Sequence, residues 1–316
     1  MKNELVKVRR FFKISLVATI TTYFLIFVGG LVRVSGAGLG CPDWPKCFGR
    51  WIPPTHINQV PDHIDASMFN FTLAWIEYIN RLIGVIVGLL ILITAVYALK
   101  NMRAYRKITV ISITALILVA LQGWQGSRVV ASALEPITVT VHMLLAFLIV
   151  SLLLYASLKS YFLLYPQKHI KQPASAKIMI FVLYVVTIVQ VVIGTQLRSQ
   201  IETINAALPL LEASEWLSRL GPVNQVHIIL GILMLILSLI MFQKVYDGRV
   251  ENQALLNGSL WTFNGLIILQ LFVGSVLFVM GLPALMQVIH LWLASFMVGA
   301  ILIIFTTVST SEKELS

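Results

Sequence analysis

Eight long apolar stretches, separated by short polar segments, dominate the pattern of the chain. Each is close to the roughly 20 residues that a helix needs to cross the hydrocarbon core of a bilayer. Backbone polar groups in lipid must be satisfied within their own segment, so we expect helices here. The pattern predicts an all-α polytopic membrane protein with eight transmembrane helices. These spans cover about residues 13–34, 75–99, 108–130, 136–160, 175–197, 222–243, 259–280 and 284–308.

A segment of the first half recurs in the second half at a constant offset of 148 positions. A fixed period of this kind indicates an internal duplication. An even number of spans in each half keeps the orientation of the halves the same, as in parallel repeats. We therefore expect two pseudo-symmetric four-helix bundles, about residues 1–165 and 172–316. The matched positions are Gln122, Gly126 and His142 in the first copy and Gln270, Gly274 and His290 in the second.

The composition supports a membrane protein, with 58% hydrophobic and only 11% charged residues. A soluble domain has about a quarter charged residues. The net charge of +10 does not indicate nucleic acid, because the basic clusters fall on alternate connections and therefore on one face. Such a bias marks the cytoplasmic side, which predicts a multi-pass cell-membrane protein in contact with lipid, with both termini cytoplasmic. The clusters lie at about 2–13, 100–107, 159–177, 244–249 and 313.

The first outer loop, from Val34 to Leu73, contains the only two cysteines, Cys41 and Cys47. The compartment outside a bacterial or organellar membrane is oxidising, which is compatible with a disulfide between them. Two interpretations stay open at this point. The pair is either a structural staple or a redox-active pair that exchanges electrons with a partner.

The second span opens with an acidic residue, Glu77, four positions before Arg81. This spacing is typical of an ion pair on one helix face. A carboxylate at the edge of a membrane span is nevertheless costly, and such residues often serve function. We favour a functional role for Glu77 over a purely structural one.

Single histidines occur inside the fourth, sixth and eighth spans, namely His142, His227 and His290, and Asn80 holds the matching position in the second span. All four lie one to two turns from the outer end of their helices. Opposed imidazoles inside an apolar bundle are suited to the axial ligation of heme iron. Packing residues and proton relays are the alternatives. A zinc or copper site would need closer ligand spacing or cysteines in the spans, which are absent.

Three arginines end odd-numbered spans on the outer side: Arg33, Arg128 and Arg198. A heme that stands on edge would present its two propionates at this level, and guanidinium groups match carboxylates in charge and geometry. The alternative is that these arginines reach from the span to the membrane interface. They are candidates for propionate binding.

With these residues assembled, the chain resembles the heme A synthase family over its whole length. The resemblance rests on the loop segment Gly36–Cys47, on the motif Glu77-Tyr78-Ile79-Asn80-Arg81, and on the single histidines of the three spans. It implies an oxidoreductase that converts the C8 methyl group of heme O into the formyl group of heme A for terminal oxidases. Heme O synthase and oxidase assembly factors are the implied partners, and a homo-oligomer is left open.

The resemblance also implies individual roles. His227 and His290 would bind a permanent heme b in the second half, and His142 would bind substrate heme O in the first. Glu77 would be the catalytic carboxylate. Cys41 and Cys47 would form the family's outer-loop disulfide.

Asn80 departs from the family pattern, which usually has histidine at this position. The substrate heme is then five-coordinate through His142, or another group such as His56, His63 or Glu77 completes the site, or the first half is inactive. A heme b electron-transfer subunit without its own substrate is the alternative function, since it needs the histidines but not Glu77. A proton-coupled transporter fits less well, because no span is broken at mid-membrane.

Overall fold

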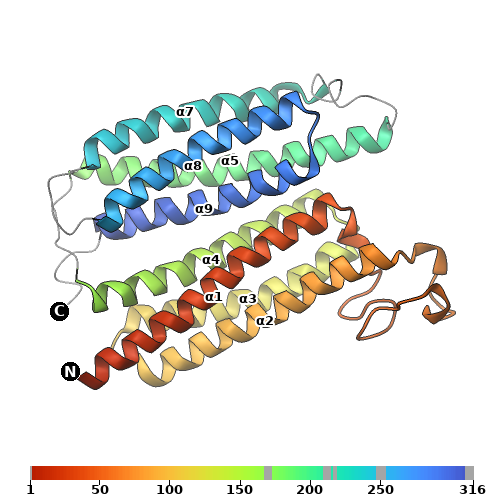
Figure 1. Cartoon of the computed structure of the whole chain (residues 1–316), viewed down its shortest axis with the longest axis horizontal. Helices are drawn as coiled ribbons and strands as arrows, with labels where there is room; N and C mark the ends of the chain where they lie inside the picture. The colour runs from red at the N-terminus through yellow and green to blue at the C-terminus, as the bar shows by residue number, and fades with distance from the viewer. Residues whose placement is uncertain (1, 167–172, 209–214, 216–218, 247–253, 310–316) are drawn as a thin grey trace. The chain divides into compact units, whose positions relative to one another are not determined.

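The computed structural model describes residues 2–166, 173–208, 215, 219–246 and 254–309 of the chain. Its long helices match the eight predicted spans, and all eight are long and apolar enough to cross a membrane. The prediction of an all-α, multi-pass membrane protein is therefore confirmed. In order they are α1 (Lys2–Val34), α2 (Phe71–Asn101), α3 (Arg106–Ala131), α4 (Pro136–Leu164), α5 (Ala174–Ala207), α7 (Gly221–Val245), α8 (Ala254–Val279) and α9 (Ala284–Ser309) (Figure 1).

The chain divides into two compact units, each of which is described separately below. The first unit is Lys13–Ala156, and the second combines Met1–Phe12 with Ser157–Ser316. The division into bundles at residues 165 and 172 stays a prediction, and the connection 167–172 lies outside the described residues.

The core of the first unit is built from small and branched apolar side chains. Leucine, isoleucine and valine side chains of α1 to α4 pack around them, while residues such as Val85 and Ile117 remain 58% and 63% exposed on the outer faces. Small residues allow membrane helices to approach closely, which is how helices associate when lipid is as apolar as their side chains. The buried members of this core are Ala18, Val87, Ile91, Ala115, Ile149 and Leu153.

In the second unit, α5 contacts α7 and α9, and α8 contacts the same two helices. Their shared core includes Leu183, Met241 and Phe263. A buried polar contact also joins two of the helices: the hydroxyl of Ser238 on α7 lies 2.9 Å from the Oδ1 atom of Asn264 on α8. Hydrogen bonds of this kind hold helices together in lipid, where unsatisfied polar groups are costly.

The duplication seen in the sequence extends to the turns between helices. Leu134, after α3, and Leu282, after α8, both have positive φ angles, 64° and 63°. Their backbone amides donate to the carbonyl oxygens of Val129 and Leu277, respectively, each at a distance of 3.0 Å. The corresponding residues lie 148 positions apart, so the repeat preserves the backbone of this corner as well as its sequence.

The outer loop contains the short helices η1 (Ala37–Leu39), η2 (Ile57–Gln59) and η3 (Ala66–Met68). It has a small apolar core of its own, in which Phe48 packs edge-on against Phe69 with 5.4 Å between ring centroids. Cys41 and Cys47 form a disulfide within this core. The expected disulfide is therefore confirmed, while the choice between a structural and a redox role stays open.

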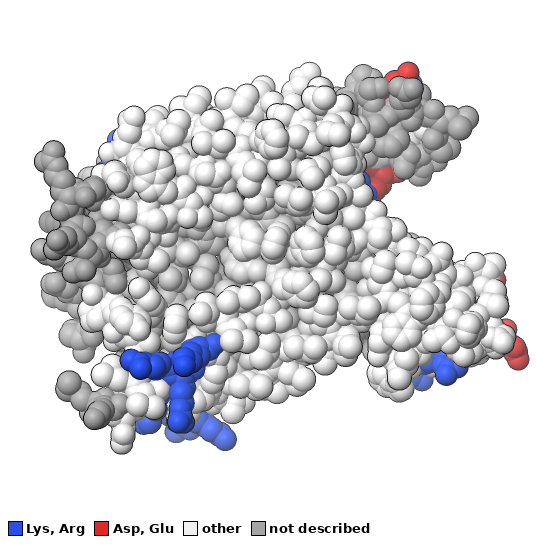
Figure 2. All heavy atoms as spheres, viewed as in Figure 1, with Lys and Arg blue, Asp and Glu red and all other residues white. Residues whose placement is uncertain are grey.

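The charged residues lie at the ends of the helices. In the first unit Lys100 lies in the last turn of α2, while Arg106 and Lys107 begin α3. Figure 2 shows that the face in view is largely uncharged, with the largest group of Lys and Arg side chains toward one end and a smaller group toward the other. The cytoplasmic orientation of the termini stays a prediction. Four residues of the predicted basic clusters lie outside the described part of the chain: Lys168, Lys171, Arg249 and Lys313.

Gly40 lies where the outer loop touches the first turn of α2. A Cβ atom at this position would lie 2.3 Å from the carbonyl oxygen of Leu73 and 2.9 Å from the amide nitrogen of Ala74. Because the obstacle is backbone, we expect Gly40→Ala to destabilise the protein by about 1–3 kcal/mol, the usual range for overpacking. Thermal unfolding in detergent measures the change. Gly84→Ala is the control, since a Cβ at that α2 position meets nothing within 4 Å, and equal stability of the two variants would contradict the prediction.

Candidate functional site

Each membrane histidine lies against a glycine of the preceding helix. The ring carbon Cε1 of His227 lies 3.4 Å from the position of a Cβ on Gly194. A methyl group at this position would just touch the imidazole, and any larger side chain would occupy the space that the imidazole fills. The same contact joins His142 to Gly126 and His290 to Gly274, each at 3.5 Å, and Asn80 Oδ1 to Gly29 at 4.0 Å.

A glutamine one helical turn before each of three glycines binds the backbone of the facing histidine. Each Nε2 amide donates to the carbonyl oxygen of the histidine residue, which ties the two helices together at the depth of the imidazole. The three bonds are Gln122 to His142, 2.9 Å, Gln190 to His227, 2.7 Å, and Gln270 to His290, 3.0 Å.

These sites contain polar atoms that are buried and have no hydrogen-bond partner. They are the Nδ1 atoms of the three histidines, the Oε1 atoms of the three glutamines, and Oδ1 of Asn80. Native proteins pair nearly all buried polar groups, so such atoms call for an explanation. Their concentration at the repeat positions marks these positions as candidate ligand sites.

His227 and His290 face each other in the second unit. Their ring centroids are 6.3 Å apart and the ring planes are inclined by 53°. When two imidazoles bind one metal from opposite sides, each metal–nitrogen bond is about 2 Å long. Adding the distance from each nitrogen to the centre of its ring gives a separation between ring centroids of about 6 Å. The donor set therefore fits a single metal between two imidazoles. Within the described part of the chain, no three His, Cys, Asp or Glu side chains form a metal cluster, and axial ligation of heme iron needs only two.

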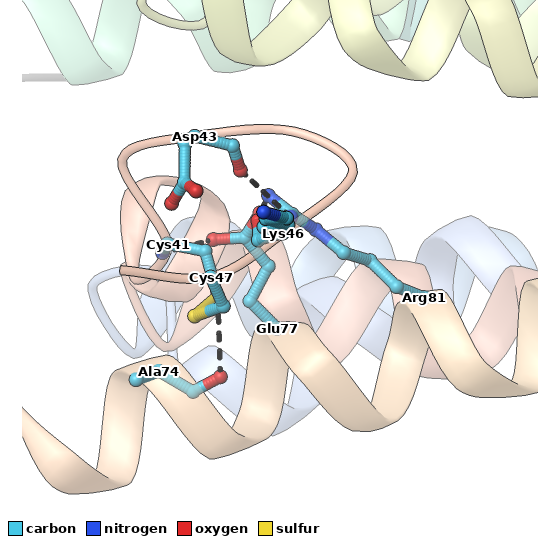
Figure 3. Close-up of polar contacts among 7 residues, drawn as sticks. All are labelled: Cys41, Asp43, Lys46, Cys47, Ala74, Glu77 and Arg81. Atoms are coloured by element: carbon cyan, nitrogen blue, oxygen red, sulfur yellow. Dashed lines mark hydrogen bonds and ion pairs between the residues drawn. A yellow bond between two sulfur atoms is a disulfide. The ribbon is translucent and has the colours of Figure 1, made fainter. Parts of the chain in front are cut away.

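Glu77 holds the outer loop against α2 (Figure 3). The residue is only 4% exposed. Oε2 accepts a hydrogen bond of 2.7 Å from the backbone amide of Cys41, and Oε1 forms an ion pair with Arg81. The Sγ atom of Cys41 lies 3.6 Å from the carbonyl oxygen of Ala74, which brings the disulfide onto the same helical turn.

Arg81 completes the attachment of the loop. Its Nη1 atom donates to the carbonyl oxygens of Asp43 and Lys46, each at a distance of 2.8 Å, while Nη2 forms an ion pair with Glu77 (Figure 3). The ion pair expected from the sequence is thus present, and it connects the helix to both arms of the disulfide loop. The catalytic role of Glu77 stays a prediction. Asn80 follows Glu77 by three positions and so lies on the same side of the helix.

The three arginines have different surroundings. Arg198 of α5 forms an ion pair with Glu202 at a distance of 2.8 Å and also donates to the Oε1 atom of Gln287 near the start of α9. It lies one turn outward from Gly194. Arg33 is half-buried and Arg128 is exposed. Propionate binding by any of them stays a prediction.

A family model described as cytochrome oxidase assembly protein matches residues 12–302, nearly the whole chain. The chain belongs to this family. The match includes both units, the disulfide loop and all four positions that face a glycine.

Individual relatives of the family match part of the chain. A heme A synthase of Shewanella oneidensis is 35% identical over 152 residues, which is 46% of this chain and 44% of the relative. Heme A synthases of Alkalihalophilus pseudofirmus and Orientia tsutsugamushi are 30% and 29% identical, over 40% and 42% of this chain and 39% and 40% of the relatives. The chain thus covers less than half the length of these relatives.

Sequence reasoning missed the glycines and glutamines as members of the site. The signal was present, because Gln122 and Gly126 recur as Gln270 and Gly274 together with the histidines. Only the structure relates them to the imidazoles, since residues on adjacent helices come into contact at distances along the chain that no local pattern encodes. Gln190 and Gly194 repeat the arrangement on α5.

Removal of Arg81 tests its role in the attachment of the loop. In Arg81→Met, the buried carboxylate of Glu77 loses its cation, and the free energy of unfolding should fall by about 3–5 kcal/mol. Equilibrium unfolding in detergent measures it, and adding Glu77→Gln should recover part of the loss. The exposed pair Lys7–Glu4 is the control, since Lys7→Met should change stability by at most about 1 kcal/mol. Similar effects of the two substitutions would contradict a structural role for the buried pair.

Proposed function

We propose that this protein is a heme A synthase, an oxidoreductase of the cell membrane that oxidises the C8 methyl group of heme O to a formyl group. The proposal is supported by family membership, by the names of the relatives and by the eight membrane helices. The observation that carries it is the facing pair His227 and His290. Heme O synthase would supply the substrate, and oxidase assembly factors would receive the product.

The second unit would hold a resident heme b between His227 and His290. Gly194 and Gly274 leave the imidazoles the room they need, and the two rings would hold the heme iron between them. Such a group accepts and releases single electrons when bound. The protein's part is to keep the two rings opposed in apolar surroundings that exclude water.

The first unit would bind heme O as substrate, with His142 as the imidazole ligand. Asn80 holds the opposite matched position, and its amide oxygen is a poor ligand for iron. One face of the substrate heme would then carry no strong protein ligand, which leaves space for an oxidant. Gly29 and Gly126 supply the clearance on the two neighbouring helices.

Glu77 would provide the carboxylate beside the reacting methyl group. Oxidation of a methyl group releases protons and builds up positive charge, and a nearby carboxylate accepts the former and stabilises the latter. Arg81 and the amide of Cys41 fix the orientation of this carboxylate. Arg33, Arg128 and Arg198 would bind propionates at the outer ends of their helices.

Loss of one axial ligand tests the resident heme. The variant His290→Ala should retain little or none of the heme b that copurifies with wild-type protein, because one strong metal bond is removed. Absorbance in the Soret region, normalised to protein, measures the content. His169→Ala, which changes a histidine between the predicted fourth and fifth spans, is the matched control and should retain normal content. Unchanged heme in His290→Ala would exclude this residue as a ligand.

Co-expression with a source of heme O tests the reaction itself. Extracted hemes should include heme A or its hydroxylated precursor for wild-type protein. Glu77→Gln keeps an oxygen that accepts from Cys41 but removes the charge, so heme content should stay near normal while product falls at least tenfold. Glu4→Gln changes an exposed carboxylate in the first turn of α1 and should leave product unchanged.

The outcomes separate the candidate functions. Heme b alone from the wild type, with no product, would favour the electron-transfer subunit over the enzyme. An active Glu77→Gln variant would remove this carboxylate from the chemistry and leave it with the role of holding the loop.

A further inference from the structure

Three glutamines share an unusual combination of one satisfied and one unsatisfied group. Each donates its Nε2 amide to the backbone oxygen of a membrane histidine and has an Oε1 atom that is buried without a partner. The facing imidazole has a buried Nδ1 atom, also without a partner. Since a carbonyl oxygen can only accept, the NH₂ group must face the backbone, and Oε1 is the free end of each amide.

The two unpartnered atoms are complementary once the imidazole binds a metal. A ring that ligates iron through Nε2 carries its proton on Nδ1, which then requires an acceptor. Buried polar atoms without partners are rare. Here a buried Oε1 and a buried Nδ1, which are not bonded to each other in this structure, occur on residues already joined by a hydrogen bond. The same combination recurs on three separate helix pairs.

The fourth helix pair provides an internal comparison. Gly29 faces Asn80, where no imidazole is present. Four positions before Gly29, the place of the glutamine is taken by Leu25, which packs against the apolar core of the first unit. The glutamine is thus found with the histidine and is absent from the pair that lacks it.

We propose that Gln122, Gln190 and Gln270 are positioning residues whose Oε1 atoms accept the Nδ1–H of His142, His227 and His290 when these rings bind heme iron. This inference rests on the proposed function. The amide remains on the histidine backbone, so each glutamine fixes both the helix and the tautomer of the ligand. An accepted Nδ1–H makes the imidazole more basic, which stabilises ferric over ferrous iron and lowers the reduction potential.

The test uses full-length protein purified with its resident heme. Gln270→Met preserves the size of the side chain and removes both hydrogen bonds. Loss of the acceptor should favour reduction about tenfold, which is about 59 mV upward for a one-electron couple. Redox titration measures the potential, and the g values of the ferric heme in electron paramagnetic resonance report the weaker imidazole donor. Heme affinity should fall by about 10–100-fold.

Two further variants separate this role from a structural one. Asn264→Leu removes another buried amide contact between α7 and α8 and should lower stability without a change in potential. Gln270→Glu keeps an acceptor oxygen and should lower the potential or leave it unchanged, opposite to Gln270→Met. If Gln270→Met loses its heme during purification, Gln190→Met, facing His227, serves in its place.

Heme-loaded Gln270→Met with the potential and g values of the wild type would overturn the inference, as would shifts of the same sign in the Met and Glu variants. Neither result would affect the proposed function. A wild-type protein that binds no heme, or a His290→Ala variant that retains all of it, would instead overturn the proposed function.

Discussion

The contact between an imidazole and a glycine on the neighbouring helix is the constraint on which the rest of the site depends. In apolar surroundings a polar ring needs space, and it needs hydrogen-bond partners from the protein because no water is present to provide them. Glycine provides the space at Gly126, Gly194 and Gly274. Since the contact involves adjacent helices, it also restricts the rotation of each helix about its axis and therefore the position of each imidazole.

The outer loop depends on a different interaction, the pairing of Glu77 with Arg81 and with the amide of Cys41. Removing two charges from water costs several kcal/mol for each ion, and good geometry with further hydrogen bonds is needed to offset it. The carbonyls of Asp43 and Lys46 supply those bonds to the guanidinium. A carboxylate that holds a loop is also oriented and desolvated, so a structural and a chemical role for Glu77 are compatible.

Much of the fold could be predicted from the sequence, because the length and hydropathy of an apolar stretch identify a membrane span, as they do for α2 and α8. The helix ends were less accessible: α1 begins at Lys2, well before the apolar stretch, because charged residues continue a helix outside lipid. The ion pair of Glu77 with Arg81 also followed from local spacing, whereas the disulfide was expected from the oxidising compartment and from the resemblance. The bonds of the glutamines to the histidine backbones could not be predicted, because they join residues on different helices. The bond of Arg198 to Gln287 was missed for the same reason, since the two residues lie 89 positions apart.

The attachment of the disulfide loop also connects the exposed part of that loop to α2. Trp51 and Ile52 of this loop are 70% and 61% exposed, while Cys41, in the same loop, binds the turn of α2 that leads to Asn80. A movement of the exposed part of the loop is therefore transmitted to the turn of α2 that carries Ala74 and Glu77.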